Sequence, residues 1–433
     1  MQPGERGVMK KLTIIGDIMC EPPVCVQAER ENDTYDFLPA FEHLKGLLSE
    51  ADFAIGNFEA PLGGKELGYT VRLVSFNAPE ELARTIKDIG IGMVTTANNH
   101  ACDRGNEGII NTVKNLDAIG LEHTGSYVNY SADDPERIFY RQIGDTKIAM
   151  ISYTYGTNYG LNKEKPDEAA GNHVNYLKPV DSRLGVGERN FPQSYKKVLA
   201  LMNRVSGGKV LWEDEVDLRN AMGIPQAYAD DILEPEESEA CLRDLQADYE
   251  EARKNADLVF IMPHMGGQFN VKPGAFSSYM VWRMKEMGFD GIFAAHSHTL
   301  QKAEVKGGVP VFWSLGNVSM APFSPYAARE TLPEYAVAAH LYLEDGEIAK
   351  TAFSLTKIIE EDDGLITVYP LDELYEKYKG AGESEVVCPG HPAEEDVKVS
   401  GVKAAEMLAA EAAEIYRRVT GRRFPGIQRE YEL

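Results

Sequence analysis

The sequence predicts an α/β fold, and two observations indicate this class. Short runs of β-branched and aliphatic residues recur along the 433-residue chain, and each has the composition of a buried strand. Segments with apolar residues at helical spacing lie between several of these runs, and such alternation is typical of a sheet covered by helices. Because the chain is longer than one typical domain, we expect one main domain with additions.

The elements can be placed in order along the chain. The apolar runs that predict strands are LTII from Leu12, FAIG from Phe53, MVTT from Met93, IAMIS from Ile148, LVFIM from Leu258, GIFAA from Gly291 and VPVFWSL from Val309. A helix is predicted from Pro79 to just before Gly90, and another from Asn106 to Ile119, before Gly120. After Ser319, strand-like segments joined by tight turns predict an antiparallel part of the sheet.

We divide the chain into a main domain, residues 1–369, and a C-terminal helical extension, residues 370–433. Within the main domain, residues from about 155 to 247 have few strand or helix signals and contain acidic stretches, so we interpret them as an insertion. The insertion is either a lid or wall over the substrate or a solvated excursion without a chemical role. The amphipathic stretch from Lys403 is expected to pack on the core or on a second subunit of a homo-oligomer.

The composition excludes several classes of protein. The net charge of −24 disfavours general binding of nucleic acid or anionic membranes, because no long-range positive field attracts a polyanion. No apolar stretch approaches the ~20 residues of a membrane span, and Gly16 and Asp17 interrupt the first apolar run. We therefore expect no membrane span, no signal peptide and a cytoplasmic location. The five cysteines form no CxxC pair, which predicts reduced thiols.

Polar residues follow the apolar runs at the point where each run ends. In an open α/β sheet, ligands bind outside the carboxyl ends of the strands, so these side chains are expected to converge. They are Asp17, Asn57, Glu59, Asn98, Asn99, His100, His264, His296, His298 and Asn317. Taken singly, each could be a turn, cap or surface residue. Their common position at strand ends favours one shared site.

The donor atoms in this set are carboxylates, amides and imidazoles, without thiolates. Such a set is expected for Mn, Fe or Zn ions, and it differs from calcium sites and from structural zinc sites. The sequence therefore predicts a centre for one or two divalent transition-metal ions. A bound ion would also supply the positive charge that an anionic substrate of this acidic chain requires.

Six motifs occur in a recognisable order: GDIM from Gly16, GNFEAP from Gly56, TANNHACDRG from Thr96, PHMGG from Pro263, AAHSHTLQ from Ala294 and WSLGN from Trp313. In this order they resemble the CapA-like proteins of poly-γ-glutamate capsule synthesis, which belong to the calcineurin-like metallophosphoesterase superfamily. The resemblance covers roughly Lys11 to Leu355, without much of the insertion. It implies a four-layer αββα sandwich with a metal centre at one edge.

The resemblance also implies roles for individual residues. The implied metal ligands are Asp17, Asn57 or Glu59, Asn99, His264, His296 and His298. The implied catalytic residues are Asp17 and His100, which occupies the position of the superfamily's proton-donating histidine. Met19 is a departure, because the superfamily usually has a histidine two residues after the first aspartate. One of two metal positions is therefore expected to be weak or empty.

These observations favour a metal-dependent hydrolase that cleaves a phosphoester or related linkage with a metal-activated water. The substrate is expected to be an anionic small molecule or polymer, which Arg72, Arg104 or Lys302 could help to hold. Two alternatives stay open. One is a non-hydrolytic accessory or polymer-binding protein of poly-γ-glutamate synthesis, and the other is a scaffold with a degenerate metal site.

Overall fold

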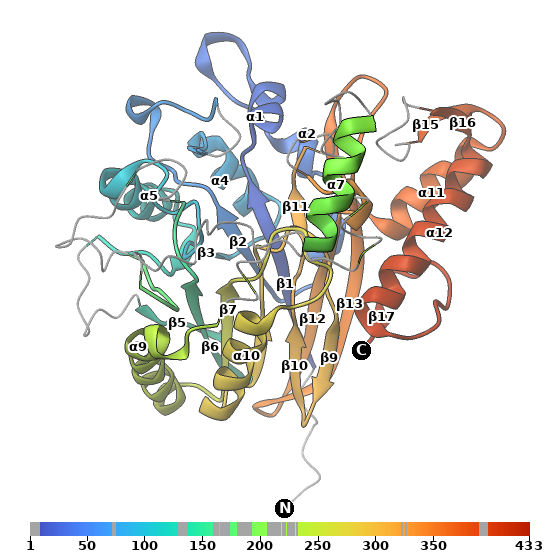
Figure 1. The fold of residues 1–433 in the computed structure, drawn as a ribbon. Coiled ribbons are helices and arrows are strands. Elements are labelled where there is room, and N and C mark those ends of the chain that lie inside the picture. The colour runs from blue at the N-terminus through green and yellow to red at the C-terminus, as the bar shows by residue number, and fades with distance from the viewer. Residues whose placement is uncertain are drawn as a thin grey trace, which may run out of the picture.

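The structure is a computed structural model, and Figure 1 shows its fold. It describes residues 9–71, 75–128, 137–158, 164, 174–179, 193–205, 218, 222, 230, 233–321, 324, 327–388 and 397–433. No helix in these ranges is long and apolar enough to cross a membrane. The four cysteines whose side chains are described, Cys20, Cys25, Cys102 and Cys241, are free.

The first sheet combines parallel strands from the first part of the chain with antiparallel strands from the last part. Its main order is β14 (Ile366–Pro370), β13 (Glu347–Glu360), β12 (Tyr335–Glu344), β1 (Lys10–Met19), β2 (Phe53–Glu59), β3 (Met93–Thr95) and β4 (Glu122–Thr124). Two short strands lie off this path: β11 (Asn317–Ser319) pairs with β1, and β17 (Tyr431–Glu432) pairs with β13. The antiparallel pairing of β12, β13 and β14 confirms the arrangement predicted after Ser319.

The second sheet is built from the middle of the chain. Its order is β5 (Phe139–Ile143), β6 (Thr146–Thr154), β7 (Leu258–His264), β8 (Gly291–Phe293), β10 (Val309–Phe312) and β9 (Ala303–Lys306). The strands from β6 to β10 in this order are parallel, and β5 and β9 are antiparallel edges. A separate two-stranded ribbon consists of β15 (Glu385–Cys388) and β16 (Val397–Ser400).

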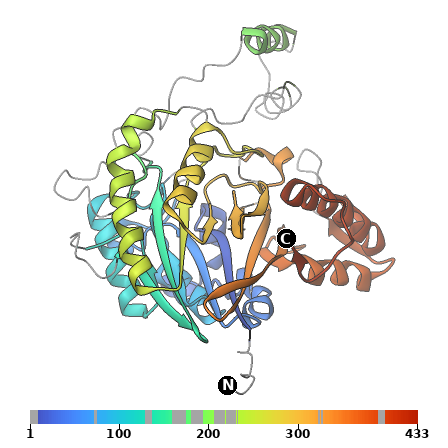
Figure 2. The same ribbon diagram turned by 90° about the horizontal axis from the view of Figure 1, so that it is seen from below.

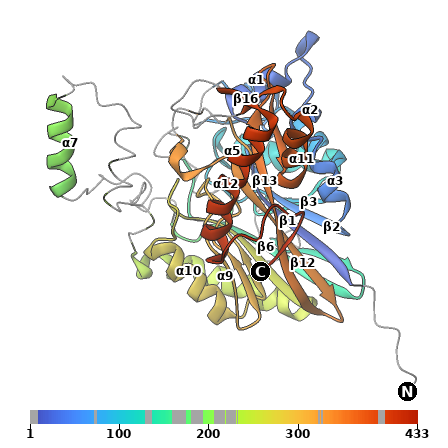
Figure 3. The same ribbon diagram turned by 90° about the vertical axis from the view of Figure 1, so that its right-hand side faces the viewer.

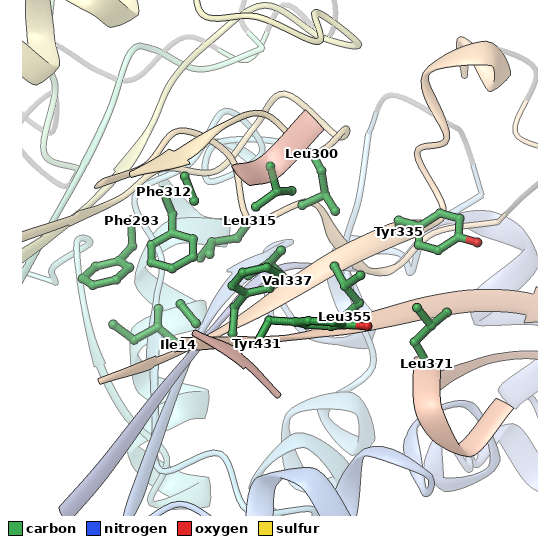
Figure 4. Close-up of a cluster of buried hydrophobic side chains, with 14 of the residues drawn as sticks. Ile14, Phe293, Leu300, Phe312, Leu315, Tyr335, Val337, Leu355, Leu371 and Tyr431 are labelled. Carbon is green, nitrogen blue, oxygen red and sulfur yellow. The ribbon is translucent and has the colours of Figure 1, made fainter. Parts of the chain in front are cut away.

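Each sheet is buried on both faces, because side chains that alternate along its strands belong to apolar clusters on opposite sides of the sheet. Leu12 and Ile14 of β1 and Ile148 of β6 belong to one apolar cluster that both sheets share. Ile15 and Ile151 belong to two other clusters, one on the outer face of each sheet. Figure 4 shows side chains from both sheets meeting in the shared cluster. The sheets therefore pack face to face.

Helices cover the two outer faces, as Figure 2 shows. Helices on the first sheet are α1 (Pro22–Ala28), α2 (Leu38–Phe41), α3 (Leu44–Ser49), α4 (Glu80–Asp88) and α5 (Gly105–Ile119). Helices on the second sheet are α9 (Pro235–Asn255) and α10 (Ala275–Met287). The predicted α/β class and its four layers are thus confirmed. Helices α4 and α5 lie within one residue of the predicted bounds.

The residues predicted as a C-terminal extension pack against the rest of the chain. These residues contain α11 (Leu371–Ala381) and α12 (Gly401–Thr420), which lie together at one side of the sheets in Figure 1. Leu408 and Ile415 of α12 belong to the same apolar cluster as the inner faces of the two sheets. The apolar face of α12 is therefore packed within the chain, and contact with a second subunit stays a prediction.

The predicted insertion is only partly described. Helix α7 (Gln193–Val205) lies apart from the layers in Figure 3. Residues 235–247 belong to the predicted insertion, but they form the first part of α9, where Leu242 and Leu245 pack on the second sheet. The predicted lid falls mainly on residues outside the described ranges.

Candidate metal centre

Strands β1, β2 and β11 bring three polar side chains to one end of the first sheet. Asp17 pairs in register with Asn57 on β2 and with Asn317 on β11. Gly16 permits this close approach, because a Cβ atom there would lie 2.0 Å from the carbonyl oxygen of Gly316. The backbone N–H of Asp17 donates to that carbonyl oxygen at 2.9 Å. The GDIM and SLGN motifs therefore meet at this point.

The second sheet contributes three histidines. His264 is the last residue of β7, and His296 and His298 follow the end of β8. The backbone N–H of His296 donates to Oδ2 of Asp17 at 3.0 Å, which ties the two sheets together at the site. The side-chain oxygen of Asn317 lies 2.9 Å from Nδ1 of His298.

Two overlapping sets of side chains have ligand atoms close enough to hold a metal ion. Glu59 belongs to both sets, with His296 and His298 in one and with Asp17 and His264 in the other. Within each set the ligand atoms lie within 4.8 Å of one another, and all five side chains are buried. Oε1 of Glu59 lies 3.3 Å from Nε2 of His264 and 3.6 Å from Nε2 of His298. This geometry suits imidazole and carboxylate ligation.

Several potential ligand atoms of this cluster have no hydrogen-bond partner among the described residues. Among the described residues, neither carboxylate oxygen of Glu59 has a hydrogen-bond partner, and Nδ1 of His296 also has none. Buried polar atoms are nearly always hydrogen-bonded, and an atom without a partner calls for an explanation such as a bound ion. The lone pairs of these atoms are therefore suited to bind a cation. His296 and His298 also have left-handed backbone, with φ of 96° and 51°. Such conformations cost about 1–3 kcal/mol at non-glycine residues and concentrate at functional sites.

The two predicted asparagine ligands differ in orientation. Oδ1 of Asn99 lies 2.7 Å from Nε2 of His264, so its oxygen faces the cluster. Asn57 instead donates from Nδ2 to Oδ1 of Asp17 at 2.7 Å, while its own oxygen accepts from Oγ1 of Thr95 at 3.1 Å. In this arrangement Asn99 presents its side-chain oxygen to the cluster, whereas Asn57 is hydrogen-bonded to Asp17.

His100 lies beside the cluster but belongs to neither set of ligands. Its Nδ1 is 2.6 Å from Oδ2 of Asp103, and its ring stacks on Phe76 with centroids 4.1 Å apart. Burial lowers the pKa of His100, but the charge and hydrogen bond of Asp103 outweigh burial and raise it overall. The amide nitrogen of Asn158 lies 3.3 Å from Nε2 of His100, and Oδ1 of the same side chain accepts from Asn99 at 3.1 Å.

The carboxylates and histidines of the cluster shift one another's pKa values. Burial raises the pKa of Asp17, but its hydrogen bond with His298 and the charge of His264 outweigh burial, so the pKa lies below its usual value. Burial lowers the pKa of His298, but Glu59 and Asp17 raise it to about 9. Burial and the two other histidines hold the pKa of His296 well below its usual range. Glu59 and Asp17 therefore stabilise positive charge on His298, whereas the cluster disfavours it on His296.

The structure brings the predicted ligand residues and His100 into this one region. Sequence reasoning missed Asp103 and Asn158. The spacing of three residues between His100 and Asp103 in one turn was an available signal for Asp103. Asn158 follows β6 in a segment without a motif, so no local pattern indicated it.

The cations suggested as substrate anchors have other contacts. Arg104 donates from Nε to the carbonyl oxygens of Leu67 and Gly68, which binds two segments of the protein together. Lys302 forms an ion pair with Glu304 at 3.2 Å, and its side chain is 47% exposed. Arg72 lies outside the described ranges.

Comparison with known proteins gives three similarities. A structure of a candidate 5'-nucleotidase from Staphylococcus aureus superimposes with a TM-score of 0.40 and 13% identity, covering 84% of this chain and 54% of that chain. The chain is 24% identical over 312 residues to capsule biosynthesis protein CapA of Bacillus anthracis, covering 71% of this chain and 58% of that protein. It is 22% identical over 313 residues to PGA biosynthesis protein CapA of Bacillus subtilis (strain 168), covering 70% and 62%.

The chain thus spans about three fifths of the length of these two relatives. The family described as bacterial capsule synthesis protein PGA_cap matches residues 11–321, which include all of the predicted site residues. This match confirms the resemblance to CapA-like proteins that the motifs indicate. The chain belongs to the PGA_cap family of bacterial capsule synthesis proteins.

Proposed function

We propose that this chain is a metal-dependent hydrolase of a phosphoester or related linkage. The observation that carries the proposal is the buried carboxylate of Glu59, which lies between His264 and His298 and has no hydrogen-bond partner among the described residues. A buried carboxylate is costly unless it is hydrogen-bonded or paired with a cation. Its surroundings of imidazoles and a second carboxylate fit a divalent transition-metal ion, such as Mn, Fe or Zn.

The roles of the residues follow from their positions. The residues that would hold one or two ions are Asp17, Glu59, Asn99, His264, His296 and His298. Such an ion, when bound, polarises a phosphoryl oxygen and activates water at neutral pH. Asn317 contacts Nδ1 of His298, which leaves Nε2 for the cluster and fixes the ring. Asn57 fixes the carboxylate of Asp17 in the same way.

His100 supplies the proton for the leaving oxygen in this proposal. Asp103 raises the pKa of His100, so its ring retains a proton at higher pH than an ordinary histidine. Phe76 and Asp103 hold the ring on two sides, which limits its rotation. A positioned acid of this kind acts on the substrate without taking part in metal ligation.

The first experiment measures metal uptake. Chelated protein is loaded with Mn, Fe or Zn ions, separated from excess metal, and analysed for metal per chain. His298→Gln should lose metal, whereas the matched control His340→Gln should retain it, because His340 is buried elsewhere, between the hydroxyls of Thr13 and Ser354. A screen of phosphomonoesters and phosphodiesters then follows. Protein that binds no metal, or that loses it equally in both variants, refutes the proposal.

A second candidate function is a non-hydrolytic role in the synthesis of poly-γ-glutamate. The names of the two relatives, which refer to capsule and PGA biosynthesis, favour it. The net charge of −24 opposes it, because poly-γ-glutamate is itself an anion. Binding of purified poly-γ-glutamate that persists after chelation and in His298→Gln, together with inactivity on all esters, would support this role over hydrolysis.

A further inference from the structure

Lys178 is a buried cation next to the candidate metal centre. The segment that contains it runs beside the end of β6, because the N–H of Leu177 donates to the carbonyl oxygen of Thr154 at 2.8 Å. Lys178 is 3% exposed. Its Nζ lies 5.2 Å from the ring centroid of Tyr155 and 5.0 Å from that of Phe276. The ammonium group is thus held between two aromatic rings, each of which attracts a cation.

Among the described residues, no side chain or backbone group forms a hydrogen bond or an ion pair with Nζ of Lys178. Asp230 and Glu237 attract it from a greater distance, and Asp230 is engaged in capping α10 through Gly274 and Ser277. Burial lowers the pKa of Lys178 to about 8, partly offset by these two carboxylates. At neutral pH the side chain therefore remains mostly charged.

Tyr155 connects Lys178 to the metal centre. Its ring lies 4.6 Å from the ring of His296, measured between centroids, and its backbone N–H donates to the carbonyl oxygen of His264 at 2.9 Å. The charge of Lys178 also reaches His296, whose pKa it helps to lower. The ring of Tyr155 therefore lies between Lys178 and one candidate metal ligand, His296.

We propose that Lys178 forms an anion subsite beside the metal centre and binds a carboxylate on the body of the substrate. The proposal rests on the proposed function, in which the metal centre binds the phosphoryl group. A buried cation without a direct partner gains most from a ligand that pairs with it. One lysine balances one negative charge, and a carboxylate carries one, whereas a second phosphate would bring excess charge close to Asp230 and Glu237. The preferred substrate is then a phosphoester that also carries a carboxylate.

The test uses ligands that the protein cannot hydrolyse. Phosphonoacetate, 3-phosphonopropionate and 4-phosphonobutyrate are compared with ethyl-, propyl- and butylphosphonate by calorimetry on manganese-loaded protein. At least one of the three carboxylate-bearing phosphonates should bind about tenfold more tightly than the alkylphosphonate of the same length. This is the gain expected for one charge-assisted hydrogen bond. Lys178→Met should remove this preference without changing the affinity for the alkyl ligand, and Lys178→Arg should restore part of it.

Lys379→Met is the matched control, because Lys379 also lies over an aromatic ring, 5.2 Å from that of Tyr375, but is exposed and lies in α11. This variant should keep the full preference. The subsite is refuted if the unmodified protein shows no carboxylate preference, if Lys178→Met retains it, or if Lys178→Met weakens both ligand series equally. Metal content is measured on every sample, so failure to bind manganese refutes the proposed function separately. In that case the carboxylate comparison on metal-free protein still tests Lys178.

Discussion

Replacing His100 with Asn should slow hydrolysis without removing metal. His100 belongs to neither set of candidate ligands, and its ring is held by Asp103 at 2.6 Å and by the stack on Phe76. Asn is polar and small enough for the same space, but it has no proton to transfer at neutral pH. A positioned general acid contributes about 10²–10⁴-fold, or about 3–5 kcal/mol of activation free energy. We expect kcat for an alkyl phosphate to fall by a factor in this range.

The leaving group distinguishes proton transfer from other roles of His100. Nitrophenolate leaves with little protonation, so His100→Asn should slow nitrophenyl phosphate much less than an alkyl phosphate. Metal per chain, measured on the same samples, should equal that of the unmodified protein. Loss of metal would show that His100 acts as a ligand. Equal slowing of both esters would show that it supports the site without donating a proton.

Asp103→Asn completes this test, because Asp103 acts through His100. Its carboxylate raises the pKa of His100, so the amide should lower that pKa. The protonated form of His100 would then be lost at lower pH, and the alkaline limb of the kcat profile should shift to lower pH. A purely structural role of Asp103 would lower activity at all pH values without this shift.

Three further predictions concern ligation, packing and pH. His298→Ala removes a candidate ligand, so metal content and hydrolysis should fall together; hydrolysis that survives the loss of metal contradicts the proposed function. Gly16→Ala puts a Cβ atom 2.0 Å from the carbonyl oxygen of Gly316, so the free energy of unfolding in urea should fall by about 1–3 kcal/mol. Unchanged stability would show that the two backbones do not approach so closely. Burial lowers the pKa of His340 to about 3, so the unfolded chain takes up a proton below about pH 6.5 that the folded chain does not. This difference should lower the free energy of unfolding by about 2 kcal/mol from pH 7 to pH 5, a loss that His340→Gln should lack; an identical decline in both proteins would exclude His340 as its source.

Local sequence patterns could predict the strands but not their partners. Apolar runs such as LTII and LVFIM correspond to β1 and β7, because burial on both faces demands continuous apolar residues. The pairing of β1 with both β2 and β12 joins segments far apart in the sequence, and no local pattern encodes it. The four-layer arrangement was therefore an implication of the family resemblance. The short helices α1, α2 and α3 were missed, since each is too short for helical periodicity.

The convergence of the site residues could be predicted because the carboxyl ends of parallel strands meet at one edge of a sheet. The sequence could not choose between Asn57 and Glu59. In the structure, the carboxylate oxygens of Glu59 have no hydrogen-bond partner among the described residues, whereas Asn57 is hydrogen-bonded to Asp17. Lys178 could not be predicted, because it lies in a short segment without periodicity or a motif. Only the fold places it near His296.

The acidic composition of the chain and the charge at its site act over different distances. At physiological ionic strength, exposed charges more than about 8 Å apart are largely screened, so most of the net charge of −24 affects how an anion approaches rather than how it binds. Binding depends on charges within the site, where burial weakens screening. There, Glu59 and Asp17 are balanced by histidines and fit a metal ion, and Lys178 provides a cation one ring away. An anionic substrate is therefore compatible with this acidic chain only where positive charge is local, and the strand ends beside Lys178 meet that condition.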